Sequence, residues 1–244
     1  MKALFRVAWR GAALGAVTLW GLARVGIVRG RPARIAGLQR AWADRVLRIL
    51  GVRLRVRGEA GGCELLVTNH LSYVDVLVLS ARLDAVFVAK REVAGWPAVG
   101  TLSRAVGTVF VDRERRRVLP DVVAAMAAAV RQGRTVVVFP EGTSTDGSQV
   151  LPFKPSLLEA AAREGWRVGW AVLRYRTPEG GPPASEAVCW WRDMTFVPHL
   201  VRLLALPRFE AELIFGDTPL ADPDRKRLAS RLWNAVRAQL APVP

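Results

Sequence analysis

Apolar and polar positions follow two different patterns along the chain, with a change near residue 50. Before it, Leu4–Val28 is apolar almost throughout, and Leu38–Leu50 carries Trp42, Val46 and Ile49 on one side. An α-helix places residues three or four positions apart on the same face, so both patterns are typical of helices. We therefore predict an amino-terminal pair of helices that forms a hairpin.

From about Arg53 onward, short β-rich runs alternate with helical stretches. The strand-like runs are Glu64–Thr68, Ala85–Ala89, Thr108–Val111, Thr135–Phe139, Val168–Tyr175 and Glu212–Phe215. The helical stretches are Tyr73–Ala81, Pro97–Ala105, Leu119–Gln132, Pro155–Arg163 and Asp222–Leu240. This alternation predicts an α/β fold, with a mixed β-sheet flanked by helices. The simplest division is a helical hairpin over residues 1–50 and one α/β domain over residues 51–244.

The charge of the chain points to a polyanionic partner. Lys and Arg number 36 against 21 Asp and Glu, which gives a formal net charge of +15. Nucleic acid and anionic lipid both fit such a charge. Nine Trp against two Tyr favour the membrane interface, and the spacings typical of zinc fingers and RNA-binding aromatic motifs are absent. We therefore predict an anionic membrane surface as partner, and no nucleic acid.

The charges of the first helix suggest how it meets a membrane. At about 100° per residue its basic side chains fall in one stripe, with Trp9 and Trp20 at its edge. The stripe consists of Lys2, Arg6, Arg10 and Arg24. The uncharged run Gly11–Ala23 is shorter than the roughly 20 residues that span a bilayer. We predict a helix lying on the cytoplasmic face of the inner membrane, with Arg toward phosphates. The alternative is a helix packed on the protein's own core, with Arg in solvent.

A first candidate site is the segment Thr68–Asp75, where a buried strand ends and a helix begins. Ligand sites in open α/β sheets lie beyond the carboxyl ends of strands. A turn between His70 and Asp75 would let the carboxylate reach the imidazole, fix its tautomer and raise its basicity. The pair would then act as general base for an alcohol. The alternative is a structural His followed by an unrelated Asp near a helix start.

A second candidate site, Phe139–Ser144, also follows a strand. Gly142 permits close backbone approach to a ligand, and successive N–H groups can hold an anion or an oxyanion. Glu141 is an acceptor for hydroxyl groups. An ordinary Glu-Gly turn is the alternative, although the polar loop continues to Gln149 and is longer than a turn requires.

A third candidate is Arg113, which follows the strand-like run Thr108–Val111 and precedes the basic Arg115–Arg117. A guanidinium can hold a phosphate with two parallel hydrogen bonds. A solvated basic loop is the alternative reading, and it fits Arg115–Arg117 better than Arg113.

Together, in this order and spacing, the three segments resemble the glycerolipid acyltransferase family. The likeness runs from about Leu50 to Ala205 and includes a His-x4-Asp block, a Gly-x-x-Phe-x-x-Arg block and a Phe-Pro-Glu-Gly-Thr-Ser block. It implies His70 as catalytic base and Asp75 as its orienting partner. It implies further that the acceptor is bound by Arg113, Glu141, Gly142, Thr143 and Lys154. The family's fourth block usually contains prolines, which Arg167–Val172 lacks, so acyl-chain and acceptor preference stay open.

The resemblance implies direct acyl transfer from acyl-CoA or acyl carrier protein to a lysophospholipid, without a metal or other cofactor. The leading acceptor is 1-acylglycerol-3-phosphate, which would give phosphatidic acid; another lysolipid such as lyso-ornithine lipid is the nearest rival. A catalytically idle, basic membrane-binding protein is the alternative of a different class. Cys63 and Cys189 are predicted to be small buried residues rather than nucleophiles or disulfide partners.

Overall fold

The computed structural model describes residues 1–28, 31–96, 99–112 and 119–240. Within these ranges seven strands form one sheet in the order β1-β7-β6-β2-β5-β3-β4. The strands are β1 Val52–Arg57, β2 Leu65–Thr68, β3 Ala85–Lys90, β4 Val109–Val111, β5 Thr135–Val138, β6 Val168–Arg176 and β7 Phe209–Phe215. The longer helices are α1 Lys2–Ile27, α2 Pro32–Leu50, α5 Leu119–Arg131, α8 Phe196–Ala205 and α9 Arg225–Gln239. The shorter ones are α3 Val74–Ser80, α4 Val99–Ala105, α6 Glu159–Glu164, α7 Ala184–Ala187 and the 3-10 helices η1 Arg91–Gly95 and η3 Pro155–Leu158.

The sheet is mixed, as the sequence predicted. Strands β6, β2, β5, β3 and β4 run parallel, whereas β7 runs antiparallel to β6 and carries β1 beside it in parallel. The carboxyl ends of the five parallel strands therefore share one edge. Because β2 and β5 are neighbours in the middle of the sheet, the loops that follow them leave side by side, at the edge where α/β proteins hold their ligands.

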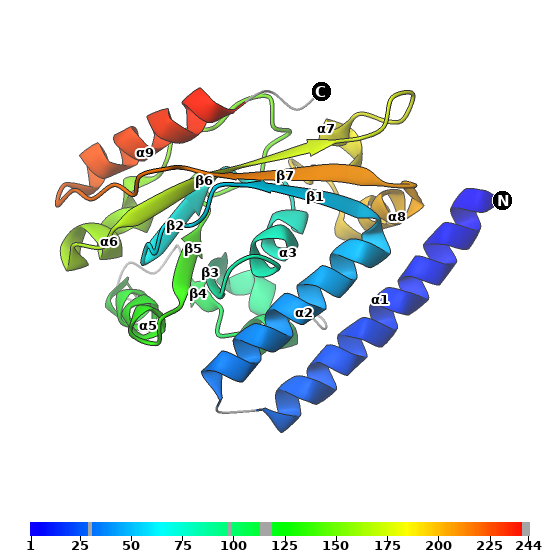
Figure 1. Ribbon diagram of the computed structural model, residues 1–244, viewed down its shortest axis with the longest axis horizontal. Coiled ribbons are helices and arrows are strands. Elements are labelled where there is room, and N and C mark those ends of the chain that lie inside the picture. The colour runs from blue at the N-terminus through cyan, green and yellow to red at the C-terminus, as the bar shows by residue number, and fades with distance from the viewer. Residues whose placement is uncertain (29–30, 97–98, 113–118, 241–244) are drawn as a thin grey trace.

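Helices cover both faces of the sheet (Figure 1). Successive strand residues point to opposite faces, so Leu65 and Val67 of β2 join one apolar cluster and Leu66 joins the other. Helices α5, α6 and α9 supply the first cluster, and α2, α3 and α8 supply the second. The strand is buried along its whole length, which explains the apolar run of its first three residues.

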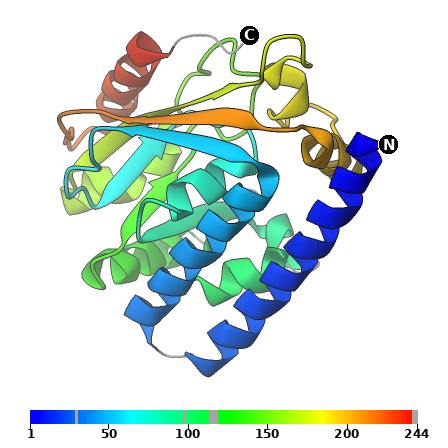
Figure 2. The same ribbon diagram turned by 45° about the vertical axis from the view of Figure 1, so that its right-hand side comes forward.

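The two amino-terminal helices form the predicted hairpin and run antiparallel (Figures 1 and 2). Helix α2 begins earlier than expected, at Pro32, and buries Ala43, Val46 and Leu47 in the core against α3 and the sheet. Helix α1 lies outside it and contacts α2 and α8. Helix α2 shares the apolar core of the α/β part. The division into two domains at residue 50 stays a prediction. Among the described residues, no helix combines the length and the apolar character needed to cross a membrane.

The interpretation of the basic stripe on α1 was wrong for two of its arginines. Arg10 is only 6% exposed, and its guanidinium donates to the carbonyls of Leu204 at 3.1 Å and Leu206 at 2.5 Å, at the end of α8. Arg6 donates to the carbonyl of Ala205. The last carbonyls of a helix have no partner within it and carry partial negative charge, so they attract cationic donors. These arginines hold α1 against α8 and do not face lipid phosphates.

Candidate active site

The loop between β2 and α3 is fixed at its start by Asn69. Its side-chain oxygen accepts the N–H of Leu173 at 2.8 Å, and its amide donates to the carbonyl of the same residue at 2.9 Å. The side chain thus replaces a backbone partner beyond the end of β2 and ties the loop to β6. His70 is the next residue, so the anchor sets where its ring emerges from the sheet edge.

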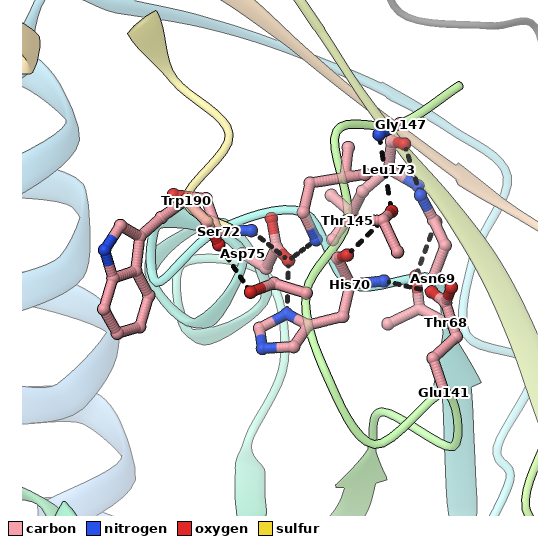
Figure 3. A network of polar contacts seen from close by, with 12 residues as sticks. Thr68, Asn69, His70, Ser72, Asp75, Glu141, Thr145, Gly147, Leu173 and Trp190 are labelled. Carbon is pink, nitrogen blue, oxygen red and sulfur yellow. Dashed lines mark hydrogen bonds and ion pairs between the residues drawn. The ribbon is translucent and has the colours of Figure 1, made fainter. Parts of the chain in front are cut away.

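The His70 imidazole meets the Asp75 carboxylate, as the spacing predicted (Figure 3). The distance from His70 Nδ1 to Asp75 Oδ2 is 2.7 Å, and Asp75 is fully buried in the first turn of α3. The same oxygen accepts the N–H groups of Leu71 at 2.7 Å and Ser72 at 3.0 Å. These bonds curl the backbone around the carboxylate, which explains how residues five apart come into contact.

The other ring nitrogen of His70 is open to a ligand. The side chain is 23% exposed, and Nε2 has no hydrogen bond to any residue that the structure describes. The imidazole stacks on the Phe139 ring, with centroids 4.0 Å apart and an angle of 22° between the planes. With Nδ1 bound to a carboxylate, the neutral ring carries its proton there and presents the Nε2 lone pair. The arrangement suits a general base, and this role stays a prediction.

Glu141 joins the two predicted loops. Its Oε1 accepts the backbone N–H of His70 at 2.8 Å, and its Oε2 accepts that of Leu151 at 2.7 Å. Burial raises the pKa of this carboxyl to about 7, although both N–H groups favour the ionised form. Thr145 adds a backbone N–H to the His70 carbonyl at 2.9 Å. These contacts support a positioning role for Glu141; the substrate contact predicted for it stays a prediction.

Replacing Glu141 with Gln is expected to lower kcat by about tenfold to a hundredfold, with a smaller change in KM. An amide offers one acceptor and one donor, so the N–H of either His70 or Leu151 would face another N–H. Losing a buried hydrogen bond to a charged group costs about 1.5–3 kcal/mol. The matched control is Glu64→Gln, because Glu64 also accepts a backbone N–H, from Arg167, but lies near the surface. Equal losses of activity in the two variants would contradict the positioning role.

The remaining predicted residues lie around the same loop. Gly142 has a φ of 76°, which favours glycine, and a Cβ there would lie 2.7 Å from Lys154 Nζ. The Lys154 amine therefore lies against the Gly142 backbone, and the Lys154 side chain is exposed, as is Thr143. Substrate binding by these three residues stays a prediction. Arg113 lies outside the described residues.

Three contacts of the site were not foreseen. The Tyr175 hydroxyl donates to Asp75 Oδ1 at 2.7 Å, and the Phe139 ring stacks on the His70 ring. Trp190 donates its backbone N–H to the Leu71 carbonyl at 2.8 Å. The available signal was a tyrosine hydroxyl near the end of a mostly apolar strand, between Arg174 and Arg176. Cys63 and Cys189 are buried free thiols, as predicted. In the described part of the chain, no three His, Cys, Asp or Glu side chains gather to hold a metal ion.

Comparison with known proteins shows which family the chain belongs to. The family model described as Acyltransferase matches residues 53–171, which contain His70, Asp75 and Glu141. The lyso-ornithine lipid O-acyltransferase of Rhodobacter capsulatus is 37% identical to the chain, over 96% of the chain and 89% of that protein. The chain belongs to the acyltransferase family.

Other acyltransferases extend the comparison. The 1-acyl-sn-glycerol-3-phosphate acyltransferase of Neisseria gonorrhoeae is 29% identical, over 72% of this chain and 69% of that protein. The crystal structure of the 1-acyl-sn-glycerophosphate acyltransferase of Thermotoga maritima superposes with a TM-score of 0.70 at 19% identity, covering 100% of both chains. This acyltransferase therefore shares the fold of that enzyme, and the predicted enzyme class is confirmed.

Proposed function

We propose that this acyltransferase moves a fatty acyl group from a thioester, acyl-CoA or acyl carrier protein, to the free hydroxyl of a lysolipid, with His70 as the base. The contact between His70 and the buried Asp75 is the observation that carries the proposal. His70 Nε2 takes the proton of the acceptor hydroxyl, and the resulting alkoxide attacks the thioester carbonyl. The C–S bond then breaks, and the leaving thiolate takes the proton back from the imidazolium. Backbone N–H groups of the site are the proposed donors to the oxyanion.

Lyso-ornithine lipid is the proposed acceptor. The Rhodobacter capsulatus relative that is named for this acceptor aligns over 96% of the chain at 37% identity, against 72% at 29% for the Neisseria gonorrhoeae enzyme. The second candidate is 1-acylglycerol-3-phosphate, which the sequence resemblance placed first. It is favoured by the exposed Lys154 amine and by Arg113, since both cations suit a phosphate. The ornithine headgroup offers a carboxylate and an ammonium group instead.

An acceptor comparison tests this assignment. We expect kcat/KM to be at least about tenfold higher for lyso-ornithine lipid than for 1-acylglycerol-3-phosphate of the same chain length, measured in identical micelles. Arg113→Ala should raise the activation free energy for the phosphate acceptor, taken from kcat/KM, by about 2–5 kcal/mol if the pair of Arg113 and the phosphate is desolvated. Arg116→Ala should change it little. A wild-type preference for the phosphate acceptor, lost in Arg113→Ala, would contradict the assignment and favour the second candidate.

We propose that α1 and α8 contact the membrane that holds the acceptor. Among the described residues, the large exposed apolar side chains other than Val56 all lie on these two helices or, for Met1, directly before α1: Met1, Leu4, Phe5, Trp9, Leu19, Ile27, Val197 and Val201. Those of α1 fall within an arc of about 140° at 100° per residue. Exposed apolar surface of this kind marks an interaction site. A cytoplasmic leaflet as partner would bring the site to its thioester donors.

Removing apolar side chains from α1 should weaken vesicle binding more than removing its charges. Serine at Leu4, Phe5 and Trp9 together is expected to lower co-sedimentation with anionic vesicles by at least about tenfold, because each large apolar group contributes about 1.5–3 kcal/mol when fully buried. The control carries Lys2→Gln and Arg24→Gln, which change exposed charges on the same helix. Release by the control but not by the serine variant would contradict an apolar contact.

A further inference from the structure

The second oxygen of Asp75 is held by a residue from a distant strand. Tyr175, near the end of β6, donates its hydroxyl to Asp75 Oδ1 at 2.7 Å, and both side chains are fully buried. The other oxygen, Oδ2, accepts from His70 Nδ1 and from two backbone N–H groups. Oδ2 therefore binds His70 and its loop, whereas Oδ1 binds Tyr175.

Both the protonation state and the position of the Tyr175 hydroxyl are fixed by its surroundings. Burial, reinforced by the nearby Asp75 charge, raises the pKa of this phenol well above its ordinary value, so the O–H keeps its proton. The ring packs against Phe209 at a centroid distance of 6.0 Å and an angle of 71°. Its backbone is paired with Ala211 of β7 in the antiparallel ladder. The direction of the hydroxyl is thus set by the sheet.

The groups around Asp75 leave its charge without a cationic side-chain partner. Four titratable side chains face it: His70 from its own loop, Tyr175 from β6, Glu141 from the loop after β5, and Cys189 from the segment after α7. Burial raises the pKa of the Cys189 thiol, which stays neutral. Within the described residues, no Lys or Arg is ion-paired with Asp75. The charge of Asp75 is therefore balanced by hydrogen bonds and by His70.

We propose that Tyr175 is a positioning residue that sets how strongly Asp75 holds the His70 imidazole. A neutral donor on Oδ1 draws part of the carboxylate charge away from Oδ2 without supplying a positive charge that would cancel it. It also fixes the plane of the carboxylate, so that Oδ2 stays in line with Nδ1. The inference rests on the proposed role of His70 as the base of the reaction.

The test is Tyr175→Phe, which removes one oxygen and keeps the ring. Without the hydroxyl the charge concentrates on Oδ2, and the protonated imidazole is held more tightly. We expect the acid limb of the pH profile of kcat/KM to move upward by about 0.5–1 pH unit, with kcat near pH 7 lowered by about tenfold. The NMR titration of the His70 ring should move in the same direction. Only two His are present in the chain, so the signal is readily assigned.

The matched control is Tyr73→Phe, since the chain has only two Tyr. The Tyr73 hydroxyl is hydrogen-bonded to His199 at 3.0 Å and not to Asp75, so this variant should leave the acid limb in place. Glu141 is unchanged in all these proteins, and the NMR titration of the His70 ring distinguishes its protonation from that of Glu141. A folded Tyr175→Phe variant with lower activity but an unchanged acid limb and His70 titration would overturn the proposal.

A second variant covers the case in which Tyr175→Phe does not fold. In a Tyr73→Phe background, 3-fluorotyrosine enters at position 175 alone and makes the hydroxyl a stronger donor. The His70 titration should then move to lower pH, and an unchanged titration would overturn the proposal. The NMR readout needs no substrate. Absence of acyl transfer to every lysolipid would therefore count against the proposed function, while the titration still decides the role of Tyr175.

Discussion

Replacing His70 with Ala is expected to lower kcat for acyl transfer by about 10²–10⁴-fold, the usual contribution of a general base. The acceptor hydroxyl loses its proton only when a base is within reach, and Nε2 is the ring atom left open by the contact with Asp75. KM for the acceptor should change little, since the imidazole acts on the proton and supplies little binding energy. The measurement is steady-state kinetics with the preferred lysolipid.

A folding control accompanies this variant. The His70 ring is partly exposed and stacks on Phe139, so its loss should lower the melting temperature only modestly. Binding to vesicles should be unchanged, because α1 and α8 are untouched. A purified His70→Ala protein with near-normal turnover would show that another group removes the proton.

Asp75→Asn is expected to lower kcat by up to about 10⁴-fold, as when the orienting carboxylate of a catalytic triad is replaced. An NH2 group at the Oδ2 position would face the two N–H groups of the loop and would donate to His70 Nδ1, which favours the other tautomer. An NH2 group at the Oδ1 position, beside the Tyr175 hydroxyl, would keep the tautomer but lose the negative charge that stabilises the imidazolium. Both outcomes weaken the base. Since the Asp75 side chain is fully buried, we also expect a loss of stability of about 1–3 kcal/mol.

The loss of catalysis is separable from the loss of stability in that variant. Activity is compared with the folded fraction at the same temperature, and Asp146→Asn serves as control. Asp146 also accepts a backbone N–H, from Ser148, but is partly exposed and does not touch His70. Activity that only tracks the folded fraction of Asp75→Asn would argue against tautomer control by Asp75.

The contact between His70 and Asp75 was predictable because it depends on local signals. An apolar run marks β2, its end marks the sheet edge, and the residues before α3 give the turn that brings Asp75 to His70. The neighbouring loop with Glu141 followed from the same rule, since it also ends a buried strand. The loops that follow parallel strands lie at the same edge of the sheet, regardless of the order of the strands.

Contacts between distant segments were not predictable in the same way. Tyr175 reaches Asp75 only because β6 lies beside β2, and an apolar run does not reveal the order of strands in a sheet. The helical pattern placed Arg10 on one face of α1 but did not reveal that α8 covers this face. Strand β1 was missed although Val52–Arg57 alternates between apolar residues and Arg, which is the pattern of a strand with one exposed face.

The most direct test of the central claim is a parallel count of free thiol and acylated lipid made by the purified protein. Direct transfer through His70 predicts no thiol above background with the thioester alone. It predicts equal amounts of thiol and acylated lipid once the lysolipid is added, and at least about a hundredfold slower formation of both products in His70→Ala. Thiol released without an acceptor, or transfer at a near-normal rate in His70→Ala, would contradict the account.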